Sequence, residues 1–136
     1  MSHSLDIAIA QPQHGQDIRR LIRCEQVEGL EELDWENLGG QWIVILKAGA
    51  VVGCIQVLPG KPIARAEFMV LDDSLSNRER AEATSMLIQH VTMLLRMAGC
   101  GAMISVVADD VAGWPVVLER RGWVPMIDGT MMIRRL

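Results

Sequence analysis

The chain has 136 residues, of which 50% are apolar and 22% are charged, and its net charge is −4. This balance is typical of one folded globular domain spanning residues 1–136 and excludes a disordered chain. The negative charge argues against a nucleic-acid partner, because general nucleic-acid binders have basic surfaces. No apolar run approaches the roughly 20 residues of a membrane helix, so we expect no membrane partner either.

The N-terminus and the cysteines indicate a cytoplasmic protein. Residues Met1 to Asp6 lack the basic segment and apolar block of a secretory signal. Cys24, Cys54 and Cys100 are far apart and form no CxxC pair, which favours small buried residues over a reactive thiol. A reducing compartment suits unpaired cysteines, and no metal-ligand set is present.

The first third of the chain predicts a strand followed by two helices. Asp6–Ala10 alternates polar and apolar residues, as a half-buried strand does, and Pro12 ends it. Asp17–Glu28 has its apolar residues on one helical face. Leu30–Leu38 predicts a shorter helix, which Gly39 and Gly40 stop.

Three strands are expected next, separated by two turns. The turns are Ala48–Gly49–Ala50 and Pro59–Gly60. The strands between and around them are Gln41–Lys47, Val51–Leu58 and Ile63–Leu71.

A polar loop, Asp72–Ser76, then leads into the longest predicted helix, Asn77–Ala98. Apolar residues recur along this helix at spacings of three and four. Ser76 and Glu79 have the S-x-x-E spacing of a capping box, and Gly99 ends the helix.

The remaining chain predicts one covered strand, a short helix and two closing strands. The strand Ala102–Ala108 is almost entirely apolar, which is typical of a strand covered on both faces. The other elements are a helix at Trp114–Arg121 ending at Gly122, and strands at Trp123–Met126 and Thr130–Arg135 around the turn Asp128–Gly129. Hairpins together with helical crossovers imply a mixed sheet with helices on both sides.

The start of the long helix has features of a phosphate site. A helix N-terminus offers unpaired N–H groups and partial positive charge, and Arg78 and Arg80 add formal charge. Glu79 and Glu82 lie in the same region and offset the two arginines. The spacing alone therefore leaves open a phosphate site or an ordinary well-capped helix.

The order of these elements resembles the GNAT superfamily of N-acetyltransferases over essentially the whole chain. Its members carry [Q/R]-x-x-G-x-[G/A] at the start of the long helix, where this chain has R-E-R-A-E-A at Arg78–Ala83. The segment Val116–Trp123 is similar to the family's A-x-x-L-Y-E-K-x-G-F stretch. Gly129–Met132 is similar to its last strand.

The resemblance implies an α/β (α+β) fold with a mixed, mostly antiparallel sheet of roughly six or seven strands and about four helices. It also implies acetyl-CoA as co-substrate, with the pantetheine arm between the strands at 63–71 and 102–108. The residues expected to bind it are Met69, Val70 and Leu71 for the acetyl and pantetheine groups, and Arg78, Glu79, Arg80, Ala81, Glu82 and Ala83 for the pyrophosphate.

Glu67 is the candidate catalytic base, since some family members carry a carboxylate at this place on the central strand. Strand alternation predicts Arg65, Glu67 and Met69 on one face, so Arg65 can pair with Glu67. A plain surface ion pair is the alternative interpretation.

By resemblance, the acceptor site is formed by the first two helices. This stretch is acidic, and Glu28, Glu32 and Trp35 are the candidate substrate residues. A negative rim would favour a cationic amine, although a solvated helix face has the same composition. The last strands of this fold often pair between subunits, so a homodimer is possible by resemblance.

Two functions follow. The first is an acetyl-CoA-dependent N-acetyltransferase that transfers acetyl directly to a primary amine of a small molecule or peptide. The second is a catalytically inactive GNAT-fold module for binding or assembly. Ala81 and Glu82 in the motif, and Leu118 where the family often has a tyrosine acid, favour the second; the chain contains no tyrosine.

Overall fold

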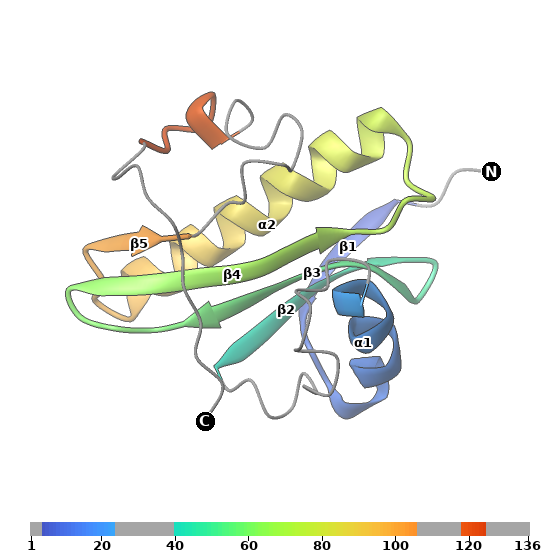
Figure 1. Ribbon diagram of the computed structural model, residues 1–136, viewed down its shortest axis with the longest axis horizontal. Helices are drawn as coiled ribbons and strands as arrows, with labels where there is room; N and C mark the ends of the chain where they lie inside the picture. The colour runs from blue at the N-terminus through green and yellow to red at the C-terminus, as the bar shows by residue number, and fades with distance from the viewer. Residues whose placement is uncertain (1–3, 24–39, 106–117, 125–136) are drawn as a thin grey trace. The chain divides into compact units, whose positions relative to one another are not determined.

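The computed structural model describes residues 4–23, 40–105 and 118–124 (Figure 1). The chain divides into two compact units, residues 1–105 and 106–136. The single-domain organisation stays a prediction.

The first unit contains a five-stranded sheet in the order β1-β2-β3-β4-β5. The four strands β1 to β4 pair antiparallel in sequence order, and β5 pairs parallel to β4. Their bounds are Leu5–Ile9 for β1, Gln41–Lys47 for β2, Ala50–Leu58 for β3, Ile63–Leu71 for β4 and Ala102–Ile104 for β5. The mixed, mostly antiparallel sheet predicted from the sequence is confirmed.

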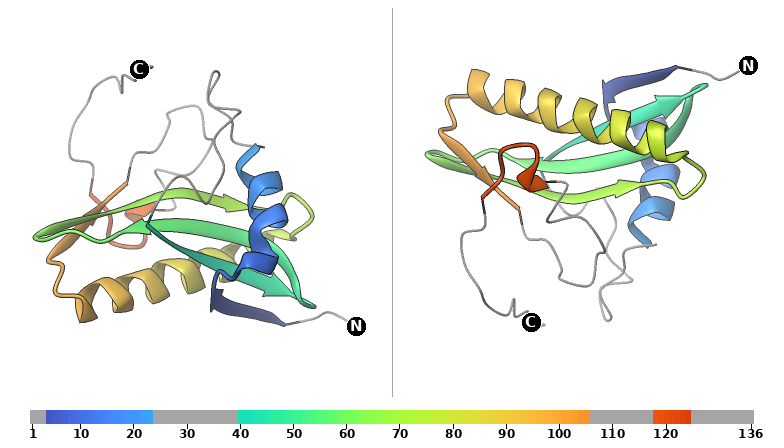
Figure 2. Two further views of the ribbon diagram at one scale, coloured as in Figure 1. Left: turned by 90° about the horizontal axis from the view of Figure 1, so that it is seen from below. Right: turned by 90° about the horizontal axis from the view of Figure 1, so that it is seen from above.

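One α-helix covers each face of this sheet (Figure 2). After a short 3-10 helix, η1 (Pro12–His14), α1 (Gly15–Arg23) packs on one face, and α2 (Asn77–Met97) packs on the other. Buried side chains of α2, including Leu87 and Val91, share a core cluster with Ile43 and Ile55. Ile18 and Leu21 of α1 form the second cluster, with residues such as Val44 and Cys54.

Coverage on both faces explains the composition of the strands. Ile43, Val44 and Ile45 of β2 are fully buried although successive side chains point to opposite faces. Strand β5 differs from its prediction, because Ala102 is exposed and Met103 and Ile104 are only partly buried. It ends at Ile104, and residues 106–108 of the predicted strand lie outside the described part of the chain.

Hydrogen bonds between neighbouring residues cap both ends of α2. Ser76 Oγ accepts the Glu79 N–H, and Glu79 Oε1 accepts the Ser76 N–H, so the predicted capping box is confirmed. At the other end, the Gly99 N–H donates to Arg96 O and the Cys100 N–H donates to Leu95 O. This Schellman motif needs the left-handed conformation of Gly99, whose φ is +82°.

In the second unit, the described residues are 118–124. The helical residues Leu118 and Glu119 lead to a second Schellman motif, in which Gly122 has a φ of +87°. This ending was predicted. Trp123 and Val124 belong to no strand, contrary to expectation. The predicted elements Leu30–Leu38 and Thr130–Arg135 lie outside the described residues.

Within the described ranges, no helix is both long and apolar enough to cross a membrane.

The turn between β2 and β3 carries backbone strain at an alanine. Ala48 has a φ of +51° and Gly49 a φ of +81°, which together define a type I′ hairpin turn. The left-handed conformation costs an L-residue roughly 1–2 kcal/mol, and asparagine tolerates it better than alanine does.

We therefore expect Ala48→Asn to raise the free energy of unfolding by about 1 kcal/mol in urea denaturation. Gly49→Ala is the matched control. No atom lies within 4 Å of the added methyl group, so backbone strain should lower the stability. Shifts of both variants in the same direction would contradict this account of the turn.

Candidate active site

Strands β4 and β5 are paired over only three residue pairs. The last pair joins Arg65 to Ile104, whereas β4 continues to Leu71. Residues 66–71 therefore have no partner strand on this edge among the residues that the structure describes. Unpaired backbone N–H and C=O groups need hydrogen-bonding partners, and an extended ligand can supply them as an added strand would.

A β-bulge interrupts β4 shortly after its pairing with β5 ends. On the β3 side Cys54 pairs with Val70 but Gln56 pairs with Glu67, so one residue of β3 faces two residues of β4. A bulge of this kind changes which face the following side chains occupy and leaves backbone groups outside the ladder.

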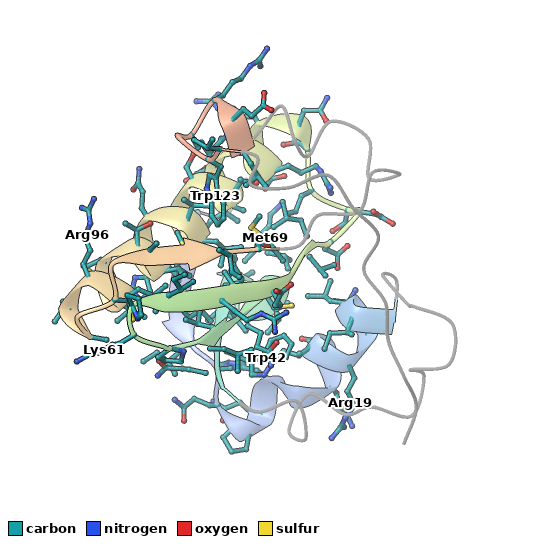
Figure 3. All side chains as sticks on the ribbon, turned by 60° about the vertical axis from the view of Figure 1, so that its left-hand side comes forward. Arg19, Trp42, Lys61, Met69, Arg96 and Trp123 are labelled. Carbon is teal, nitrogen blue, oxygen red and sulfur yellow. The ribbon has the colours of Figure 1, made fainter. Side chains whose placement is uncertain are left out.

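The prediction that Met69 lies on the same face of β4 as Glu67 is wrong, and the bulge is the reason. Met69 packs against the α2-side cluster, together with Leu71, whereas Val70 belongs to the α1-side cluster. Figure 3 shows Met69 and Trp42 on opposite sides of the sheet. Uninterrupted alternation would have placed Met69 with Glu67, but the extra residue shifts it to the other face.

Glu67 lies on the α1 side of the sheet, between Arg65, the last residue paired with β5, and the bulge. Its side chain is 15% exposed, and Oε1 accepts hydrogen bonds from Arg65 Nε at 3.3 Å and Arg65 Nη2 at 3.1 Å. The predicted pairing of Arg65 with Glu67 is confirmed. The role of Glu67 as base stays a prediction.

Gln56 is a neighbour of Glu67 that the sequence analysis missed. It is the cross-strand partner of Glu67 on β3, and only 2% of it is exposed. A glutamine within the otherwise apolar run of β3 was the available signal, because buried polar side chains need a reason to be there. Gln56 is therefore a buried polar neighbour of Glu67 on the adjacent strand.

The N-terminus of α2 offers two backbone donors. The Glu79 N–H is taken by Ser76 Oγ, and the Arg80 N–H donates to Ser76 O at 2.8 Å. The N–H groups of Asn77 and Arg78 have no partner within the described part of the chain. A phosphate at this helix start would therefore bind at Asn77 and Arg78.

This position lies upstream of most of the predicted pyrophosphate residues. Ala81, Glu82 and Ala83 are inside α2, where their N–H groups bond to carbonyls four residues earlier. The methyl group of Ala83 is fully buried in the core, whereas Ala81 and Glu82 are exposed. The helix starts at Asn77, as the capping box predicts, so most of the motif lies inside it.

The two arginines at the helix start have different surroundings. Arg80 Nη1 donates to Asp72 O at 3.1 Å and so holds the loop between β4 and α2. Arg78 is exposed and makes no ion pair or side-chain hydrogen bond with other described residues. Arg78 is thus the arginine available to an anionic ligand.

Glu79 forms an ion pair with Lys47 that the sequence analysis does not predict. Lys47 Nζ lies 2.6 Å from Glu79 Oε2. The hydrogen bond from Lys47, followed by that from the Ser76 N–H, lowers the pKa of Glu79 to about 2. Of the two acidic charges that argued against an anionic ligand, that of Glu79 is therefore paired.

Asp72 ties the loop before α2 to α1 and β3. Its Oδ2 lies 2.7 Å from Arg20 Nη1, its Oδ1 accepts the Ser74 N–H, and its own N–H donates to Val52 O. The Ser74 N–H, and to a smaller extent Arg20, lower the pKa of Asp72. These bonds fix the path of the chain into the helix start.

The remaining candidates are only partly within the described residues. The predicted substrate residues Glu28, Glu32 and Trp35 lie outside them, as does Cys24. Burial raises the pKa of Cys54 to about 12, which makes it an unreactive core thiol. Within the described ranges, no group of three or more histidine, cysteine or acidic residues could hold a metal ion.

Solved structures with the same fold cover almost the whole chain, although no family model and no curated protein sequence matches it. Aminoglycoside N-acetyltransferase AAC(6')-Iy in complex with CoA is 15% identical with a TM-score of 0.75, over 100% of this chain and 98% of that one. A ribosomal-protein-alanine N-acetyltransferase from Brucella melitensis is 14% identical with a TM-score of 0.71, over 98% and 100%.

A transcriptional regulator from Bacillus halodurans is 13% identical with a TM-score of 0.76, over 96% of this chain and 100% of that one. Identities at this level establish the fold alone. The chain therefore has the fold of the GNAT-type acetyltransferases, which confirms the resemblance seen in the sequence.

The Lys47–Glu79 pair predicts a specific acid dependence of stability. Folded Glu79 stays ionised down to about pH 2, whereas in the unfolded chain it takes up a proton near its ordinary pKa of 4.5. The unfolded state binds more protons between these values, so stability falls as the pH decreases through this window.

We expect the free-energy difference between the wild type and Glu79→Gln to be full above pH 4.5 and to shrink toward pH 2, as measured by urea denaturation across this range. Glu82→Gln is the control, since Glu82 is exposed and pairs with none of the described residues. An identical pH dependence in the wild type and Glu79→Gln would refute the pairing.

Proposed function

We propose that this protein is an acetyl-CoA-dependent N-acetyltransferase that acts on a primary amine. The observation that carries the proposal is the edge of β4 that no described strand pairs with beyond Arg65. It has a carboxylate at Glu67, and the chain leads from it to the Asn77 and Arg78 N–H groups, which have no partner among the described residues. These features occur in a fold shared with acetyltransferases, one of them solved with CoA.

Acetyl-CoA would bind along this edge. The N–H groups of Asn77 and Arg78, together with the Arg78 guanidinium, would hold the pyrophosphate. The backbone of Met69–Leu71 would bond to the pantetheine arm and the acetyl carbonyl, since no strand among the described residues pairs with β4 there on the β5 side. Lys47 assists by neutralising Glu79.

The chemistry is a direct acyl transfer. Glu67, itself or through one water molecule, takes a proton from the acceptor ammonium. The amine nitrogen attacks the thioester carbonyl, a C–N bond forms, and the C–S bond breaks. The nitrogen loses its second proton and the departing sulfur gains one. The chain has no tyrosine, so solvent or another group supplies that proton.

For the acceptor we propose a small-molecule or peptidyl amine. An aminoglycoside acetyltransferase and a ribosomal-protein-alanine acetyltransferase both share the fold. The acidic stretch containing Glu28, Glu32 and Trp35 would attract a cationic amine. A cytoplasmic location and a homodimer belong to the same proposal.

Acetyl-CoA binding is the first test. At 100 times its Kd, acetyl-CoA should stabilise the fold by about 2.7 kcal/mol, which thermal denaturation with and without ligand measures. Arg78→Gln should weaken binding roughly tenfold, as loss of a charge-assisted bond does. Arg96→Gln makes the same change at the opposite end of α2 and should bind as the wild type does.

The result that overturns the enzyme proposal is the absence of any stabilisation at millimolar acetyl-CoA. That outcome would favour the inactive binding or assembly module instead.

Glu67→Gln is the test of catalysis. The amide keeps the shape of the carboxylate but accepts no proton, so kcat should fall at least about 100-fold while the Kd for acetyl-CoA stays unchanged. Steady-state kinetics on a panel of amines and calorimetry measure the two quantities. Equal turnover of wild type and variant would remove Glu67 from the mechanism.

A further inference from the structure

We propose that Arg65 is a positioning residue that holds the Glu67 carboxylate in the orientation needed to accept a proton. This inference rests on the proposed function and adds a second residue to its chemistry. Arg65 itself need not touch the acetyl group or the amine.

The two hydrogen bonds from Arg65 converge on one oxygen of Glu67. Nε and Nη2 lie 3.3 and 3.1 Å from Oε1, and no described residue bonds to Oε2. Because a guanidinium presents its donors in a rigid planar fork, two bonds to one oxygen restrict rotation of the carboxylate. Oε2 is thereby left for the acceptor amine or a bridging water.

The backbone of Arg65 is suited to this task by its place in the sheet. Arg65 pairs with Leu58 on β3 and with Ile104 on β5, so both edges of the strand are held there. From Ala66 onward, β4 has no partner strand on the β5 side among the described residues. Within the described part of the chain, Arg65 is therefore the last β4 residue with strand partners on both sides, two positions before Glu67.

Burial explains why the carboxylate needs a positioning partner. The Glu67 side chain is 15% exposed and the Arg65 side chain is 51% exposed. The carboxylate is therefore largely removed from solvent, whereas the arginine remains hydrated. Gln56 fills the cross-strand position beside Glu67. A partly desolvated carboxylate needs donors in place of water, and Arg65 provides them without closing the site.

An ordinary surface ion pair has the same distances but a different consequence. It contributes little to stability and nothing to turnover. The positioning role instead makes the effect of Arg65 on kcat depend on the presence of Glu67.

The experiment is a double-mutant cycle with Arg65→Met, Glu67→Gln and the combined variant. Arg65→Met should lower kcat about tenfold and leave the acetyl-CoA Kd within about twofold of the wild type. In the Glu67→Gln background the same change should cause no further loss. Arg65→Lys should restore part of kcat, since an ammonium can reach Oε1 but lacks the planar fork.

Arg96→Met, an exposed arginine elsewhere, is the matched control and should leave kcat unchanged. Thermal denaturation checks that each variant is folded, and Arg65→Gln replaces Arg65→Met if the latter is not. An unchanged kcat in Arg65→Met, or an equal loss with and without Glu67, would overturn the inference. Failure of the wild type to bind acetyl-CoA would overturn the proposed function itself.

Discussion

Strand β4 has a neighbouring strand along both edges only as far as Arg65. Beyond this point one edge has no partner strand within the described residues, and the bulge opposite β3 places Met69 on the face opposite to that of Glu67. Unsatisfied backbone groups in the middle of a folded unit are costly unless something binds them. The open edge of β4 is thus the constraint from which the proposed ligand, its orientation and the position of Glu67 all follow.

The helix that follows β4 depends on interactions from elsewhere in the first unit. Asp72 connects the loop before α2 to Arg20 and to β3, and Lys47 of β2 neutralises Glu79. Asp72 and Glu79 thus each have a cationic partner, whereas Glu82 pairs with none of the described residues. The result is a helix N-terminus with two amides that no described residue bonds to and with the charge of Arg78, although its local sequence is nearly neutral.

Much of the fold was predictable because local patterns carried it. The bounds of β2 and β4 match the prediction at both ends, and the capping box of Ser76 and Glu79 has the predicted bonds. The candidate site was less predictable. A bulge depends on the register between two strands, and sequence alternation contains no information about a residue inserted into a ladder.

The sequence by itself determined the order of elements, the capped start of α2, the pairing of Arg65 with Glu67 and the resemblance to an acetyltransferase fold. Each of these rests on residues a few positions apart or on their order along the chain. Only the tertiary structure decided that Lys47 neutralises Glu79, that Gln56 lies beside Glu67 and that the pairing of β5 with β4 ends at Arg65. These contacts join residues from separate strands and helices, so they form only when the sheet assembles.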